Sequence, residues 1–307
     1  MKELLNKFKG PILLFITAFF WGTTFVAQSL GSDYVGAFTY NGGRFIITGI
    51  ILSLFVVVRS LITKKRPMID TTIIGKKKVY LYACLVGLTL FIGATLQQLG
   101  INLTKSPAKS GFITTTYIVF VPLLGLFFKK KIKPMLWILL IVALIGSYLI
   151  SINGNLELEL GDLLTLVCAI AFAMQIVFID LVSPYIDSIL LTAIEFMIAG
   201  IMSIILMLIC EDISFTNIIH AAPAILYAAV FSGCIAYTCQ IIGQKYTEAS
   251  VATLIMSLES VIALISGVII LHDVITLRIC IGCILIFTAT ILAQVNFDKL
   301  FKKKTKR

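Results

Sequence analysis

Runs of about twenty apolar residues, separated by short polar or charged segments, recur from one end of the 307-residue chain to the other. A run of this length can cross the hydrocarbon core of a bilayer as a helix. The spans that can be drawn are 11–30, 38–58, 79–98, 108–128, 134–152, 162–181, 189–209, 223–243, 250–271 and 277–296. The pattern therefore predicts an all-α integral membrane protein with ten transmembrane helices.

The composition supports this interpretation and excludes a large soluble domain. Hydrophobic residues make up 59% of the chain and charged residues 13%, against about 25% charged residues in an ordinary soluble protein. The first apolar run follows a basic start, as in a signal peptide. However, Trp21 and Gly22 interrupt it, and no cleavage site of small residues is evident. We expect this run to be retained as the first span.

The charged residues between the spans are divided unevenly between the two sides of the predicted membrane. With the N-terminus taken as cytoplasmic, 21 Lys and Arg residues fall on the cytoplasmic side and three on the other. Cytoplasmic segments carry such an excess of positive charge, so the sequence predicts a multi-pass plasma-membrane protein with both termini inside. The basic runs adjoin spans, so the net charge of +10 indicates topology and no nucleic-acid partner.

The second half of the chain repeats the first. Residues 41–50 (NGGRFIITGI) align with 192–201 (TAIEFMIAGI) at an offset of 151, and residues 95–104 align with 238–247 at an offset of 143. Each repeat holds five spans, and an odd number inverts the second copy in the membrane. The expected organisation is a first five-helix repeat at 10–152, a second at 161–297 and a basic cytoplasmic tail at 298–307.

Several short motifs are similar to those of EamA-type transporters in the drug/metabolite transporter superfamily. They are Trp21-Gly22 with Phe25, Arg44-Phe45, Gly161-Asp162, Gln244-Lys245-Tyr246-Thr247 and Ser257-Leu258-Glu259. The likeness covers nearly all of the chain. It implies two inverted five-helix halves, a central cavity and transport of small metabolites. The chain departs from the family pattern at Ser260, where Pro is frequent.

Glu259 is the first candidate site residue, because it lies about nine residues into an otherwise apolar span. A carboxylate at membrane depth costs about 2.5–3.5 kcal/mol on insertion scales, so it should face protein or water. One interpretation is that it binds a substrate amine or carries a coupled proton. The other is a neutral carboxyl bonded to a neighbouring helix. Its repeat mate at an offset of 142 is Tyr117, so it has no charged twin.

Arg44 and Glu195 form a second pair of candidates, because they occupy equivalent positions in the two repeats. The Arg44 guanidinium offers a fork of donors to a carboxylate or phosphate. Glu195 would suit a cationic group or a proton. Alternatively, Arg44 bonds backbone carbonyls and both residues belong to a structural charge network.

Further candidates are polar or aromatic residues within spans. The repeat mates Gln97 and Gln240 suit a symmetric cavity wall, although intramembrane amides also join helices. Trp21, Tyr117 and Tyr237 would give the cavity an aromatic wall, and plain packing is the alternative.

These features favour a secondary transporter of a small organic metabolite, for example an amino acid or related zwitterion, that works by alternating access with or without proton coupling. The alternatives are a broad exporter of drugs or toxic metabolites and, in a different class, a channel or membrane scaffold. The chain has no Walker A, H-E-x-x-H or G-x-S-x-G motif, so neither ATP drive nor an enzyme is expected. We expect no metal site and no cofactor. The expected partners are a small-molecule substrate and the lipid bilayer, with a monomer or homodimer both open.

Overall fold

The computed structural model describes residues 2–104, 107–130, 132–151, 159–271 and 276–293, which are almost entirely helical. The predicted basic tail at 298–307, and the predicted repeat ends at 152 and 297, lie outside the described residues.

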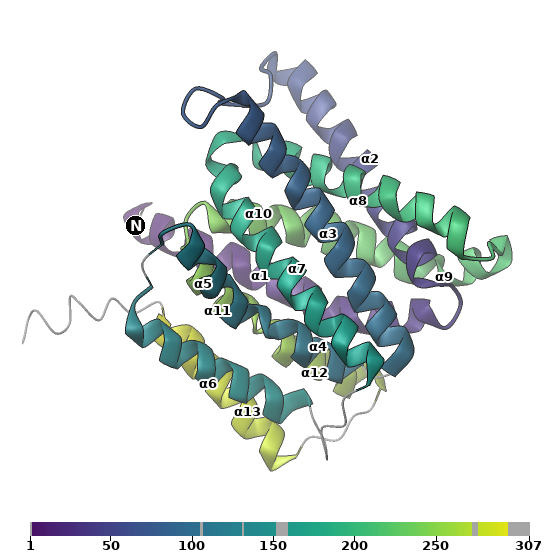
Figure 1. The fold of residues 1–307 in the computed structure, drawn as a ribbon, viewed down its shortest axis with the longest axis vertical. Helices are drawn as coiled ribbons and strands as arrows, with labels where there is room; N and C mark the ends of the chain where they lie inside the picture. The colour runs from purple at the N-terminus through teal and green to yellow at the C-terminus, as the bar shows by residue number, and fades with distance from the viewer. Residues whose placement is uncertain (1, 105–106, 131, 152–158, 272–275, 294–307) are drawn as a thin grey trace, which may run out of the picture.

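Ten apolar helical segments follow one another through the described part of the chain (Figure 1). They are α1 (Lys2–Ser32), α2 (Ala37–Thr63), α3 (Lys76–Thr104), α4 (Pro107–Thr115) with α5 (Tyr117–Phe127), α6 (Pro134–Ser151), α7 (Leu160–Val182), α8 (Ser188–Cys210), α9 (Phe215–Tyr227) with η2 (Ala228–Tyr237) and α10 (Thr238–Gln244), α11 (Ala249–Met256) with α12 (Glu259–Leu271), and α13 (Leu277–Ala293). Eight are long and apolar enough to cross a membrane; the two shorter apolar helices are Pro134–Ile150 and Leu277–Ala293. The prediction of ten transmembrane helices is confirmed.

Two of the ten segments are broken near their middle, and the breaks occupy equivalent positions. The fourth segment is interrupted at Thr116 and the ninth at Ser257 and Leu258. Thr116 and Leu258 are repeat mates at the offset of 142. Neither break was predicted. Pro122 lies inside α5 without ending it.

The eighth segment contains a different irregularity. Between α9 and α10 the chain forms the π-helix η2, whose wider turns interrupt the α-helical hydrogen-bond ladder. Ser232 and Tyr237 both lie in this stretch and both are buried. A π-helix inside a span changes which side chains face inward, which a simple hydrophobic pattern does not reveal.

Helices α2 and α8 show how the two repeats are related. Gly49 of α2 packs against Met197, and Gly200 of α8 packs against Ile46. The two contacts are equivalent, because Gly49 and Gly200 are repeat mates at the offset of 151, and so are Ile46 and Met197. Residue numbers rise along α2 as they fall along α8, so the helices are antiparallel and the two-fold axis relating them runs across the bundle.

Helices α6 and α13, which lie side by side at one edge of the molecule, repeat this arrangement (Figure 1). Gly146 packs against Ile286, and Gly282 packs against Ile150, at an offset of 136. The first segment of each repeat also packs on the third segment of the other repeat. Helix α1 contacts α9, η2 and α10, and α7 contacts α3. The two five-helix repeats are therefore inverted, as the sequence predicted.

Most of the described loop cations gather at one end of the bundle, here called the basic end. It carries Arg59, the loop between α2 and α3, Lys130 and Lys245. Arg59 forms a 3.0 Å ion pair with Asp187, the residue that caps α8, and Lys245 donates to the Ile186 carbonyl at 2.9 Å. The loop is joined to the same turn because Asp187 N–H donates to the Met68 carbonyl at 2.8 Å.

The close approach of α2 and α8 gives a first testable prediction. In Gly200→Ala the new Cβ would lie 2.8 Å from Ile46 Cδ1 and 3.0 Å from Ile46 N. Overpacking of this kind costs about 1–3 kcal/mol, so we expect a lower midpoint of thermal unfolding in detergent. The matched control is Gly111→Ala, whose Cβ would meet Phe25 Cζ at 3.7 Å. Equal midpoints for the two variants would contradict the prediction.

Candidate functional site

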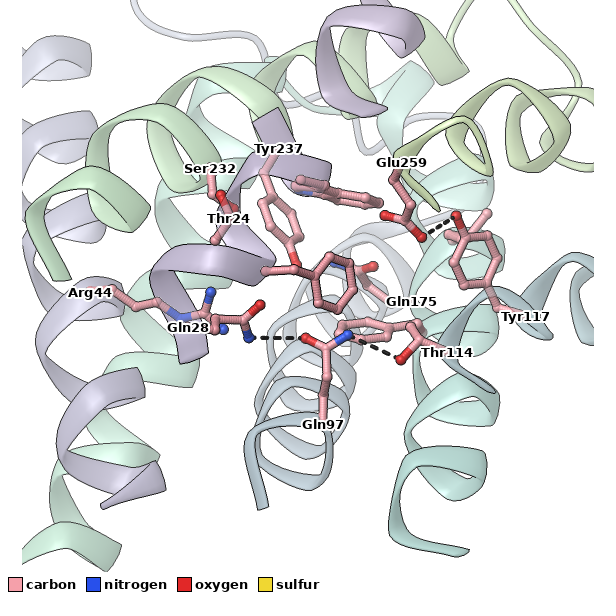
Figure 2. Close-up of a pocket in the computed structure, with 14 residues that line it drawn as sticks. Thr24, Gln28, Arg44, Gln97, Thr114, Tyr117, Gln175, Ser232, Tyr237 and Glu259 are labelled. Carbon is pink, nitrogen blue, oxygen red and sulfur yellow. Dashed lines mark hydrogen bonds between the residues drawn. The ribbon is translucent and has the colours of Figure 1, made fainter. Parts of the chain in front are cut away.

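A cavity lined by residues of both halves of the chain lies between the two repeats (Figure 2). The wall is formed by Trp21, Thr24, Phe25, Gln28, Arg44, Gln97, Thr114, Tyr117, Phe172, Gln175, Ile176, Ser232, Tyr237 and Glu259. Helices α1 to α5 supply one part of this wall, and α7, η2 and α12 supply the other.

Glu259 enters the cavity as the first residue of α12, directly after the break in the ninth segment. Tyr117 is the first residue of α5, after the equivalent break, and its hydroxyl donates a 3.0 Å hydrogen bond to Glu259 Oε1. Both side chains are buried. The start of a helix also favours a carboxylate, because the helix dipole is positive there. The repeat mates aligned in the sequence thus contact each other directly.

The start of α12, which carries Glu259, is packed closely against helix α1. A Cβ at Gly22 would lie 2.6 Å from the Glu259 carbonyl oxygen, so glycine at this position lets α1 contact the start of α12. Ser260, which replaces the frequent Pro, lies 3.1 Å from Thr115 across the two breaks, hydroxyl to hydroxyl. The ninth segment is broken at Ser257 and Leu258 although no proline stands at position 260.

Arg44 reaches the cavity from α2 on the side opposite Glu259 (Figure 2). Its Nε donates to Asn41 Oδ1 at 2.9 Å, one turn earlier, and Asn41 is held by the Ala94 carbonyl at 3.1 Å. The guanidinium carbon also lies 4.6 Å from the centre of the Phe45 ring. Within the described residues this guanidinium is hydrogen-bonded through Nε, which leaves its terminal nitrogens for a ligand.

A chain of amides crosses the cavity between these two charged groups. Gln28 Nε2 donates to Gln97 Oε1 at 3.2 Å, and Gln97 Nε2 donates to Thr114 Oγ1 at 3.2 Å. The same Gln28 amide also donates to Gln98 Oε1 at 3.2 Å. These bonds join α1, α3 and α4, so the amides both connect helices and present polar atoms to a bound molecule.

Aromatic rings form the rest of the wall. The rings of Trp21 and Tyr237 are 4.9 Å apart, and Tyr237 makes an edge contact with Phe196 at the same distance. Trp21 Nε1 is buried and has no hydrogen-bond partner in the described part of the chain. An unpartnered indole N–H beside a cavity is available to an acceptor on a ligand.

Two of the eight predicted site residues, Glu195 and Gln240, do not line the cavity. Both are fully buried. Glu195 is hydrogen-bonded to Gln175, which does line the cavity, and it therefore lies one residue behind the wall. Neither side-chain polar atom of Gln240 has a partner among the described residues. The other six, Trp21, Arg44, Gln97, Tyr117, Tyr237 and Glu259, meet at the cavity.

The structure adds residues that the sequence did not single out as site residues. Gln28, Thr114 and Gln175 are polar residues within spans, where contacts within or between helices are the ordinary role. Phe25 belonged to a family motif but was not assigned to the site. Thr24, Phe172, Ile176 and Ser232 carried no signal, because one residue facing a cavity leaves no pattern along the chain. Asn41 had a usable signal, since a residue three positions before Arg44 lies on the same face of a helix.

The ends of the bundle around the cavity are tied by two ion pairs on α7. Near its start, Asp162 accepts from Lys109 of α4 at 2.7 Å. Near its other end, at the basic end, Asp180 pairs with Lys130, which follows α5. Burial lowers the pKa of the Lys130 ammonium, and the nearby Glu248 carboxylate acts in the opposite direction. The fourth and sixth segments are thus joined on both sides of the cavity.

This geometry suits binding and not bond breaking. The cavity offers a cation, a carboxyl, amides and aromatic faces, and in the described residues no group of three or more His, Cys, Asp or Glu could hold a metal ion. Broken helices that present polar groups at a site between inverted repeats are a common arrangement in secondary transporters.

Comparison with known proteins agrees with this class. The profile of the EamA-like transporter family matches residues 8–152 and 159–294. The chain belongs to this family, within the drug/metabolite transporter superfamily, and is a multi-pass membrane transporter and not an enzyme.

Relatives span most of the chain. It is 27% identical to an uncharacterized transporter of Archaeoglobus fulgidus, over 96% of this chain and 88% of the relative. It is 26% identical to the uncharacterized transporter YvbV of Bacillus subtilis, over 96% and 94%. It is 24% identical to the uncharacterized inner membrane transporter YedA of Escherichia coli, over 87% and 83%. A solved crystal structure shares the fold with a TM-score of 0.74 at 15% identity, over 92% of this chain and 96% of that one.

Proposed function

We propose that this protein is a secondary transporter that carries a small organic zwitterion, such as an amino acid, across the plasma membrane by alternating access. The observation that carries the proposal is that Arg44 and Glu259 enter one cavity from opposite sides. A carboxylate would bind the free edge of the guanidinium, and an ammonium would bind the Glu259 carboxyl. The amides and aromatic rings between them would contact the body of the molecule.

The inverted repeat supports alternating access as the mechanism. Two similar halves can exchange conformations, so that the cavity opens to one side and then to the other. We propose further that the basic end faces the cytoplasm, because cytoplasmic loops carry the excess of Lys and Arg. The driving force would be a proton gradient or exchange, since this chain has no Walker A motif.

The proposal is tested by uptake into proteoliposomes that contain the purified protein. The probes are radiolabelled glycine, β-alanine, γ-aminobutyrate and ε-aminocaproate, which separate the two charges by increasing lengths. Hexanoate and hexylamine, each with one charge, are the matched controls. We expect saturable counterflow of one or more zwitterions and little of either control.

Each other outcome points to a different function. Preference for the singly charged or neutral apolar compounds would favour a broad exporter. Flux that does not saturate would indicate a channel. No flux of any probe, from protein that unfolds cooperatively, would contradict the zwitterion proposal.

A further inference from the structure

Glu195 does not line the cavity described above, but it is bonded to Gln175, which does. Glu195 lies about two turns into α8 and is fully buried. Its Oε1 accepts from Gln175 Nε2, and its Oε2 has no hydrogen-bond partner among the described residues. Glu195 takes part in no ion pair among the described residues. The ion pairs found there are Arg59–Asp187, Lys109 with Glu159 and Asp162, and Lys130–Asp180.

Among the described residues, the helices packed against α8 bring no cation into an ion pair with this carboxyl. Helix α2 carries Arg44, which is bonded to Asn41 and faces the cavity. The titratable neighbour from η2 is Tyr237, whose ring packs on Phe196, the next residue of α8. Helix α3 contributes Gly87, which approaches the Glu195 carbonyl. An ionised carboxylate at membrane depth, without a cation, is costly enough that a proton or metal ion is expected to accompany it.

Gln175 provides the connection between Glu195 and the cavity. Its Nε2 is bonded to Glu195, while its Oε1 is buried without a partner and the residue lines the cavity wall (Figure 2). An amide has donors at one end and an acceptor at the other, so it can serve both forms of a carboxyl. Its NH₂ donates to the carboxylate; after rotation, its carbonyl accepts from the protonated acid.

We infer that Glu195, with Gln175, forms the binding site for the coupling proton, separate from the cavity where Glu259 binds substrate. This inference rests on the proposed secondary transport and divides the two intramembrane carboxyls between two roles. A hydronium ion in the cavity gives its proton to Glu195, leaving water and the neutral acid, and release reverses this step. The Gln175 amide rotates so that Glu195 can receive the proton from the cavity, and the amide does not itself carry the proton.

The surroundings favour a proton over a metal ion. One Glu195 oxygen is already occupied by the Gln175 N–H, and the described residues contain no metal-binding group of three or more His, Cys, Asp or Glu. Helix α10, which packs on both α7 and α8, carries Gln240, a further buried amide without a hydrogen-bond partner among the described residues.

The first test needs no substrate. Infrared difference spectra of the purified protein between high and low pH report the carbonyl stretch of protonated carboxyl groups. We expect a titrating band in the wild-type protein that disappears in Glu195→Gln, persists in Glu259→Gln and shifts in Glu195→Asp. A wild-type band unaffected by Glu195→Gln, in protein with a normal unfolding midpoint, would overturn the inference.

The second test separates the inference from the proposed function. Using the same four radiolabelled zwitterions, we expect Glu195→Gln to keep counterflow within about threefold of wild type and to lose accumulation driven by a pH gradient. Glu259→Gln is expected to lose both. Gradient-driven accumulation in Glu195→Gln, or drive by a sodium gradient in wild type, would overturn the proton site. Loss of wild-type counterflow for every probe would overturn the proposed function instead, while the infrared result would still decide the proton site.

Discussion

Arg44→Gln is expected to reduce uptake of the transported zwitterion about tenfold to a hundredfold, mainly through a higher KM. Hydrogen bonds to a charged group contribute about 1.5–3 kcal/mol, and each 1.4 kcal/mol is a factor of ten in affinity. Glutamine keeps a polar side chain of similar length but loses the fork of donors. Arg44→Lys keeps the charge without the fork and should give an intermediate loss.

The control for this prediction is Arg59→Gln on the same helix. Arg59 is a half-buried arginine that pairs with Asp187 at the basic end and does not line the cavity. Initial rates of uptake should therefore show a specific loss in the Arg44 variant and a small change in the control. Equal rates for Arg44→Gln and wild type would assign Arg44 a structural role, through Asn41 and the Phe45 ring.

Asp180→Lys is expected to open the basic end of the cavity and to slow uptake about fivefold to thirtyfold. The change turns the attraction between residue 180 and Lys130 into repulsion. Because Lys130 is more than a third exposed, solvent screens the pair, and about 1–2 kcal/mol remains to shift the conformational balance. Alternating access requires one end to close while the other opens, so a protein held open at one end transports slowly.

Hydrogen exchange measured by mass spectrometry distinguishes this effect from general unfolding. Exchange should increase where α5 and α7 end at residues 127 and 182 and stay unchanged near the Lys109–Asp162 pair. The swap of Lys130→Asp with Asp180→Lys restores an attractive pair and should recover most of the uptake. If the single reversal left both exchange and uptake unchanged, or if the swap recovered nothing, the ion pair would have no part in opening that end.

Six of the eight residues singled out in the sequence line the cavity; whether they bind a substrate stays a prediction. Glu259 and Arg44 are conspicuous because each is a charged residue in an apolar span, which physical chemistry permits only next to protein or water. Repeat alignment then paired Glu259 with Tyr117, and the two form a hydrogen bond. Residues such as Phe172 and Ile176 could not be recognised, because an apolar residue suits a cavity wall, a helix contact or lipid equally well.

Glu195 shows the limit of the repeat argument. Its mate Arg44 lines the cavity, yet Glu195 lies behind Gln175. The mate of Gln175 at the offset of 151 is Thr24, a shorter side chain, and Thr24 lines the cavity together with Arg44. Equivalent backbone positions therefore present different groups to the cavity, and this asymmetry depends on side-chain size in the packed structure.

The sequence by itself determined the ten spans, the inverted repeat and the excess of cations between certain spans. These follow from the length of apolar runs and the offsets between similar segments, which are properties of the chain read in order. Only the tertiary structure decided where the fourth and ninth segments break, and that the π-helix η2 brings Tyr237 to the cavity. The reason is that a polar residue in an apolar run must avoid lipid, but which neighbour it meets instead depends on how the helices pack.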